Sequence, residues 1–154
     1  MGSEPYYYFV RYQRDIEEAL QQLRRREFEA GRYNPLIRRR PFMESPTDSP
    51  NSKPRTSRME RHGSIEEARE AAGADGTRSI LDIEHIGDQP DFCVATRIDP
   101  EALKDLYGTT EPTHEMIEPN MGFLDDIERG HAIYVVVYKN GQPDELFFAG
   151  YSFD

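Results

Sequence analysis

The chain has 154 residues, a formal net charge of −10, nine Tyr, eight Phe and no Trp. This length predicts one domain. A single cysteine, Cys93, excludes an internal disulfide framework. The longest apolar run, 132–138, is too short to cross a bilayer. Since no secretory signal is recognisable in the first residues, we expect a cytoplasmic protein without membrane contact.

Charge is unevenly distributed along the chain. Between Arg24 and Arg61 there are 11 Lys and Arg against 5 Asp and Glu, and the remaining residues carry a net charge of −16. An acidic body favours basic partners and repels nucleic acid, whereas the basic segment has the opposite preference. The alternative is that the two parts attract each other within one molecule.

The first part of the chain predicts a strand followed by a helix. Residues 6–10 are aromatic and typical of a strand. Asp15 is a helix N-cap with Glu18 at the capping-box position, and Gly31 ends the helix. Its apolar face is formed by Ile16, Ala19, Leu20, Leu23 and Ala30. Glu27 projects from this same face, which predicts either pairing with an arginine at the rim, the favoured alternative, or a buried acid with a raised pKa.

The periodic pattern then stops. Residues 45–58 contain no aliphatic or aromatic side chain, so they cannot offset their own ordering entropy. We therefore predict a flexible Pro/Ser/Arg-rich loop over 41–62. It is inserted in a single domain spanning 1–154, because the elements before it are too few to fold alone.

Capping residues and apolar runs mark the elements that follow. In order, they predict a helix over 64–73, strands over 79–83 and 92–98, a helix over 99–108, and two short helices between 113 and 129. The boundaries rest on capping boxes, on Asp-Pro at a helix start, and on glycines at helix ends.

The last part of the chain predicts a β-hairpin. Two β-branched and aromatic runs, 132–138 and 145–153, flank Asn140-Gly141. The first run is apolar on both faces, so it must be covered on both sides and lie centrally in the sheet. Strand 6–10 is expected as its other neighbour. Pro143 lacks an N–H group. At this position the second strand is therefore either an edge strand or lies beyond the hydrogen-bonded ladder.

These elements together predict an α+β fold. We expect a mostly antiparallel sheet of about five strands, packed with three to four helices.

One acidic segment is a candidate metal site. Asp82 and Glu84 would share one face of a strand, with His85 beside them and Asp88 in the next loop. Carboxylates so placed could hold a hard cation for a small metal-assisted hydrolase or transferase. The favoured interpretation is that these residues form the solvent-exposed face of a half-buried strand. The metal ligands therefore stay undetermined.

Other catalytic signals are weak. His114-Glu115 at a helix start is a possible acid–base pair, but acidic residues are common at helix starts anyway. Cys93 has no basic neighbour in sequence and is typical of a small buried hydrophobe. Since phosphate-cradling and nucleophile motifs are absent from the sequence, no cofactor is predicted.

The basic segment is a candidate nucleic-acid interface. Arg25, Arg38, Arg39 and Arg40 lie near Tyr33 in the sequence. Guanidinium groups pair with phosphates and aromatic rings stack on bases, a combination that suits single-stranded RNA. The acidic remainder of the chain opposes this interpretation.

The aromatic strands are a candidate protein interface. Tyrosine suits surfaces that are apolar at one end and wet at the other. If helices cover only one face of the sheet, Tyr134 and Tyr138 could line an exposed second face. The alternative is that other helices or the basic insert cover it.

Three functions follow from these patterns. The first is a non-enzymatic acidic module of the immunity or regulator type, which masks a basic surface on a protein partner; this rests on an analogy of charge alone. The second is binding of RNA or single-stranded nucleic acid through residues 24–61. The third is metal-assisted catalysis by Asp82, Glu84 and Asp88.

Overall fold

The computed structural model describes residues 5–33 and 62–153. Its strands are β1 (Tyr6–Arg11), β2 (His85–Gly87), β3 (Val94–Arg97), β4 (Ala132–Lys139) and β5 (Gln142–Gly150). Its α-helices are α1 (Ile16–Ala30), α2 (Ile65–Ala72), α3 (Pro100–Tyr107) and α4 (His114–Ile117). Three 3₁₀ helices are η4 (Gly73–Asp75), η5 (Ile80–Asp82) and η6 (Gly122–Asp126). All but the last residue of the predicted loop 41–62 lies outside the described residues.

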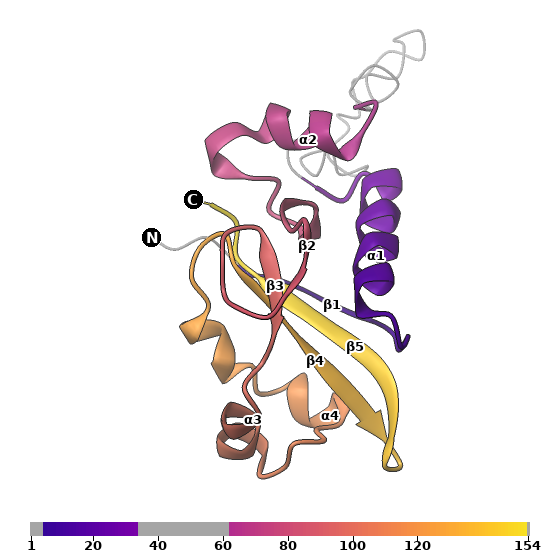
Figure 1. The fold of residues 1–154 in the computed structure, drawn as a ribbon, viewed down its shortest axis with the longest axis vertical. Helices are drawn as coiled ribbons and strands as arrows, with labels where there is room; N and C mark the ends of the chain where they lie inside the picture. The colour runs from indigo at the N-terminus through magenta and orange to yellow at the C-terminus, as the bar shows by residue number, and fades with distance from the viewer. Residues whose placement is uncertain (1–4, 34–61, 154) are drawn as a thin grey trace, which may run out of the picture.

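The five strands form one mixed sheet in the order β1-β5-β4-β3-β2 (Figure 1). The long ladders, β1 with β5 and β5 with β4, are antiparallel, and the shorter β3 and β2 join in parallel. This confirms the predicted α+β fold with a mostly antiparallel sheet. β4 occupies the predicted central position.

The predicted neighbour of β1 was wrong. β1 pairs with β5, from Tyr6 opposite Gly150 to Arg11 opposite Glu145. The remaining flank of β4 is taken by β3, which returns in parallel after η5 and β2. The two ends of the described chain still meet, as Figure 1 shows. Pro143 lies beyond the β1 ladder, opposite Tyr138 at a register shift, so its missing N–H removes no bond to β1.

The strand predicted over 79–83 was also wrong, because this segment is the 3₁₀ helix η5. The Ser79 side chain accepts a hydrogen bond from the Leu81 N–H and caps the turn. The apolar side chains of the segment are buried all the same. A short apolar run does not distinguish a strand from a single helical turn. The strand that pairs with β3 is instead β2, a few residues later.

Helix boundaries follow the predicted capping residues. Asp15, Ser64 and Asp99 each accept a backbone N–H at the first turn of α1, α2 and α3. Gly31 and Gly108 end α1 and α3 in the left-handed conformation, at φ 71° and 73°. That conformation is costly for residues with a Cβ.

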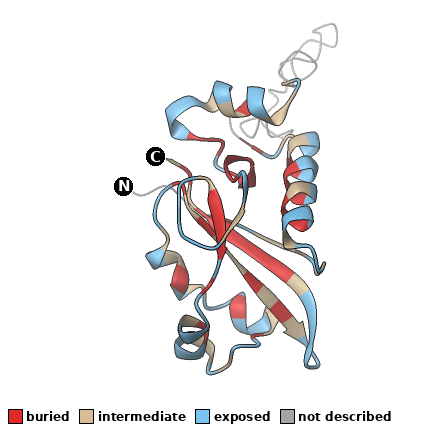
Figure 2. Cartoon of the chain, viewed as in Figure 1, coloured by how far each residue is buried: buried red, intermediate tan, exposed pale blue. Residues whose placement is uncertain are grey.

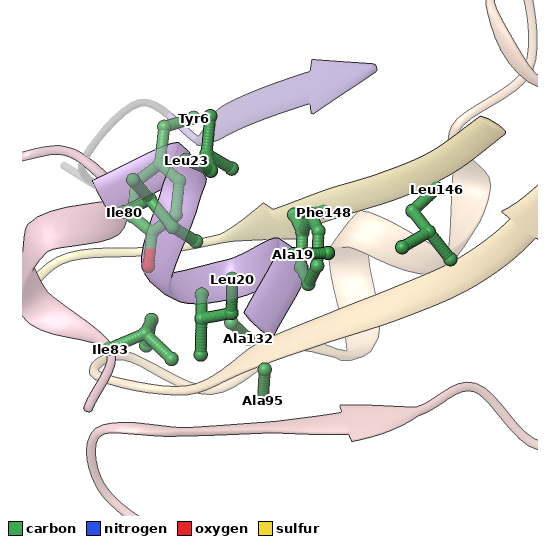
Figure 3. Close-up of a cluster of buried hydrophobic side chains, with 10 residues drawn as sticks. All are labelled: Tyr6, Ala19, Leu20, Leu23, Ile80, Ile83, Ala95, Ala132, Leu146 and Phe148. Atoms are coloured by element: carbon green, nitrogen blue, oxygen red, sulfur yellow. The ribbon is translucent and has the colours of Figure 1, made fainter. Parts of the chain in front are cut away.

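The sheet is covered by helices on both faces. On the α1 face, the buried cluster comprises Tyr6, Ala19, Leu20, Leu23, Ile80, Ile83, Ala95, Ala132, Leu146 and Phe148 (Figure 3). On the opposite face, under α3, α4 and η6, it comprises Ile98, Leu103, Ile117, Phe123, Val135, Val137, Phe147 and Ala149. β4 and β5 contribute to both clusters. The burial of both their faces therefore agrees with the sequence pattern (Figure 2).

Glu27 is both buried and paired. Its side chain is 4% exposed, and its carboxylate accepts bonds from Arg32 at 2.8 Å and Arg26 at 3.1 Å. The favoured prediction of an arginine partner is confirmed, but the carboxylate does not lie at an open rim. No helix in the described ranges has the length and apolar character needed to span a bilayer.

Candidate functional site: an acidic helical layer

More than half of the net negative charge of the described chain, −7 of −12, lies in the segment whose helices cover one face of the sheet. Residues 99–130, which include α3, α4 and η6, are named here the acidic layer. Its carboxylates are all exposed: Asp99, Glu101, Asp105, Glu111, Glu115, Glu118, Asp125, Asp126 and Glu128. Only Lys104 and Arg129 oppose these nine, which leaves a net charge of −7. Figure 2 shows exposed stretches on α3 and α4.

Few of these carboxylates are neutralised. Glu118 pairs with His114 at 2.9 Å, and Glu128 lies 3.8 Å from His131. The other seven form no ion pair with a described residue. By contrast, residues 5–33 contain six Arg against five Asp and Glu, a net charge of +1. The two segments therefore differ in net charge by eight, from +1 to −7.

His114 fastens the acidic layer to the sheet. It is the first residue of α4, and its ring stacks on Phe9 of β1 with centroids 3.9 Å apart. Its Nδ1 lies 2.8 Å from Glu145 Oε1 on β5, and its Nε2 lies 2.9 Å from Glu118 Oε2. The pairing with Glu115 suggested by the sequence is replaced by contacts with these two carboxylates.

The hydrogen bond from Glu145, with further contributions from both carboxylates, raises the pKa of His114. When protonated, the imidazole donates from both nitrogens and links α4 to β5. Because both nitrogens are engaged, neither is open to a substrate in this arrangement. The contacts support a role in structure rather than in acid–base catalysis.

Asp82, a candidate metal ligand in the sequence, is fully buried. Its Oδ1 accepts from the Thr77 N–H and hydroxyl, both at 2.8 Å, and its Oδ2 accepts from the Ser152 hydroxyl at 2.7 Å. A Cβ at Gly76 would lie 2.7 Å from Oδ2, and this glycine has φ +78°. The carboxylate thus ties the C-terminal segment to the loop before η5.

The other residues of the candidate metal site are exposed, whereas Asp82 is buried. Glu84 is exposed and pairs with Arg69 at 2.9 Å, and His85 and Asp88 are exposed. No group of three His, Cys, Asp or Glu within 5–33 and 62–153 is placed to hold a metal ion. The shared strand face on which that prediction rested is absent, because Asp82 lies in η5.

Tyr6 is a buried phenol beside this polar cluster. Its hydroxyl has no hydrogen-bond partner among the described residues. Burial, followed by the nearby Asp82 charge, raises the pKa of Tyr6 well above its usual value. The Tyr6 hydroxyl lies 2.7 Å from where a Cβ on Gly150 would be, so only glycine fits opposite it.

Cys93 is half-buried just before β3. Arg69 Nη2 lies 3.4 Å from its Sγ, but burial is the larger effect and raises the pKa of the thiol. A raised pKa lowers the thiolate fraction at neutral pH, which disfavours nucleophilic chemistry.

The proposed nucleic-acid residues are described only in part. Arg38, Arg39 and Arg40 lie outside the described residues. Arg25 is exposed on α1 and lies 3.4 Å from Glu18. Tyr33 is fully buried, stacks on Phe28 and bonds His62 Nδ1 through its hydroxyl at 2.8 Å. A base could stack on this ring only if these contacts opened. Nucleic-acid binding would therefore depend on the four arginines rather than on Tyr33.

Tyr134 and Tyr138 are half-buried. Tyr134 packs against the core cluster on the α1 face, and burial raises the pKa of its phenol. Helices lie on both faces of the sheet, so these tyrosines do not line a wholly uncovered face. Among the described residues, the exposed large apolar side chains are instead Tyr7 at 51%, Phe92 at 54% and Met116 at 42%.

Sequence reasoning missed Tyr7 and Met116. Tyr7 alternates with buried Tyr6 on β1, and period-2 alternation could have marked it as facing the opposite side of the sheet. Met116 lies on a four-residue helix, which is too short for a periodic signal.

Neither a family model, nor a curated protein, nor a solved structure matches the chain.

The His114 linkage predicts a pH-dependent contribution to stability. A pKa raised on folding stabilises the fold fully below the unfolded-state pKa of about 6.5. This contribution is lost as pH rises through the folded-state pKa. In urea unfolding, we expect the stability advantage of the wild type over His114→Gln to shrink as pH rises from about 5.5 to about 9. An advantage that stays constant over this range would contradict the linkage.

The hydrogen bonds of Asp82 with Thr77 and Ser152 predict that this carboxylate stabilises the fold without any bound ligand. Asp82→Ala leaves the buried Thr77 N–H and the Ser152 hydroxyl without their acceptor. We expect a loss of about 3 kcal/mol in the free energy of unfolding, measured with urea. Asp88→Ala is the matched control at an exposed carboxylate and should change it by less than about 0.5 kcal/mol. Equal effects of the two variants would show that Asp82 has no such structural role.

Proposed function

We propose that the chain is a non-enzymatic protein-binding module, of the inhibitory or regulatory type, whose acidic layer masks a basic surface on a partner protein. The observation that carries this proposal is the charge distribution: nine exposed carboxylates against two cations in residues 99–130. Most of these carboxylates are free to pair with a partner. Their number and exposure favour a cationic surface over nucleic acid.

Such a layer would act first through the rate of association. Exposed charges of one sign steer an oppositely charged partner and raise the association rate constant, and this effect weakens as salt increases. Beyond a separation of about 8 Å at physiological ionic strength, exposed charges are largely screened. Binding that depends on the acidic layer should therefore be sensitive to salt.

Met116 offers an apolar contact within the acidic layer. It is 42% exposed and lies on α4 next to exposed Glu115. Methionine adapts its shape to irregular surfaces, and protein interfaces are enriched in it. An apolar contact surrounded by carboxylates fits a partner surface with an aliphatic or aromatic residue ringed by Lys and Arg.

The strongest candidates for catalysis are engaged in structural contacts. Both ring nitrogens of His114 contact glutamates, the Asp82 carboxylate is saturated by hydroxyl and backbone donors, and the pKa of Cys93 is raised. These contacts favour binding over catalysis as the function of the described part of the chain.

The test is a pull-down from source lysate with two variants of equal net charge. One triple variant neutralises the acidic layer with Asp105→Asn, Glu115→Gln and Asp126→Asn. The control neutralises three exposed carboxylates elsewhere, with Glu66→Gln, Glu70→Gln and Asp88→Asn.

We expect a basic protein to be retained at low salt by the wild type and by the control, to be released at high salt, and to be lost from the acidic-layer variant. Retention of nothing at low salt, or equal retention by both triple variants, would contradict the proposal.

A further inference from the structure

β1 is an edge strand whose outer backbone groups are open. The Tyr12 N–H donates to the Asp144 carbonyl at 3.1 Å, in register with the β1–β5 ladder. In an antiparallel ladder, hydrogen-bonded and non-hydrogen-bonded pairs alternate. Even-numbered residues of β1 therefore bond to β5, and Tyr7, Phe9 and Arg11 direct their N–H and C=O groups away from the sheet.

No described residue bonds to these outward groups. The opposite edge of the sheet differs, because α1 side chains cap it. Glu17 Oε1 accepts from the Ile86 N–H at 2.9 Å, and Gln21 Nε2 donates to the Glu84 carbonyl at 2.9 Å. One edge is thus closed by α1 side chains, while the β1 edge has no hydrogen-bond partner within residues 5–33 and 62–153.

β1 also lacks the usual protection of an edge strand. Proteins discourage pairing at edges with Lys, Pro, bulges or very short strands. β1 has six residues with no Pro, no Lys and a single charge, Arg11. Its ladder with β5 is regular, and Tyr7 exposes half of its surface beside the open edge.

We propose that β1 pairs with β1 of a second copy of this chain, antiparallel and around a two-fold axis at Phe9. The two sheets would then continue as one. The backbone groups of this edge lie outside residues 99–130, although the Phe9 ring stacks on His114 of the acidic layer.

The register follows from the outward residues. Only the alignment with Phe9 opposite its own copy places all three outward residues of one strand opposite outward residues of the other. Tyr7 then faces Arg11 in both directions, and the three pairs exchange about six hydrogen bonds. Alignments shifted toward the N-terminus bring in Pro5, which lacks an N–H. Those shifted toward the C-terminus place outward residues opposite positions beyond Arg11, where the strand ends.

The charges are compatible with a second copy. In this register each Arg11 faces the ring of Tyr7, a favourable cation–aromatic pair, and no like charges lie directly opposite each other. A basic peptide would find a positive side chain and no carboxylate on β1 itself. The edge therefore fits a copy of itself better than it fits a cationic strand.

The expected dimer is weak. Pairing of two six-residue strands buries less surface than a standard protein–protein interface, which buries about 800 Å² per partner. We therefore expect dissociation constants in the micromolar range or above, so that monomer and dimer exchange with concentration.

Sedimentation equilibrium of the full chain, from about 10 μM to about 1 mM, tests the association. Two variants at one exposed position test the register. Tyr7→Arg places like charges opposite each other at Arg11, and Tyr7→Glu places opposite charges there. The net charge becomes −9 in the first variant and −11 in the second, from −10. Repulsion between whole molecules would therefore favour association of Tyr7→Arg.

The proposed register predicts the reverse order, with Tyr7→Glu dimerising about tenfold more tightly than Tyr7→Arg. A wild type that stays monomeric up to the highest concentration would overturn the proposal. Association of Tyr7→Arg that equals or exceeds that of Tyr7→Glu would also overturn it.

Discussion

Burial of both faces of the β4–β5 hairpin is the constraint on which the rest of the fold depends. Alternate residues of β5 enter opposite clusters, Leu146 and Phe148 under α1 and Phe147 and Ala149 under α3, α4 and η6. Full burial of an aliphatic or aromatic side chain contributes about 1.5–3 kcal/mol. Because neither face can be left to water, the chain places a helical layer on each, and the sheet lies between them.

The division into two layers also separates charge. The α1 segment is nearly neutral, because its arginines are matched by glutamates, including the buried Glu27. Most carboxylates of the opposite layer form no ion pair within the described part of the chain. Its anchor to the sheet is His114, which lies between Glu118 and Glu145. The acidic surface and part of the core beneath it thus come from the same residues, 99–130, with apolar side chains inward and carboxylates outward.

The elements with strong local signals were predictable from sequence. Capping residues located α1, α2 and α3, and Asn140-Gly141 located the hairpin, whose two residues have φ of 53° and 77°. What could not be predicted depends on contacts distant in sequence. The buried Asp82 carboxylate accepts a hydrogen bond from Ser152, 70 residues away. β1 pairs with β5 because β3 occupies the other side of β4. No local sequence pattern predicts this parallel pairing of β3 with β4. The acidic charge was predictable, but its location on one layer required the fold.

Amide hydrogen exchange measured residue by residue tests the central claim most directly. If the hairpin is buried on both faces, the amides of 135–137 and 146–148 should exchange only through global unfolding, with protection equal to the free energy of unfolding from urea titration. Exchange of these amides at the rate of an unstructured peptide would contradict the two-layer architecture and the charge separation that depends on it.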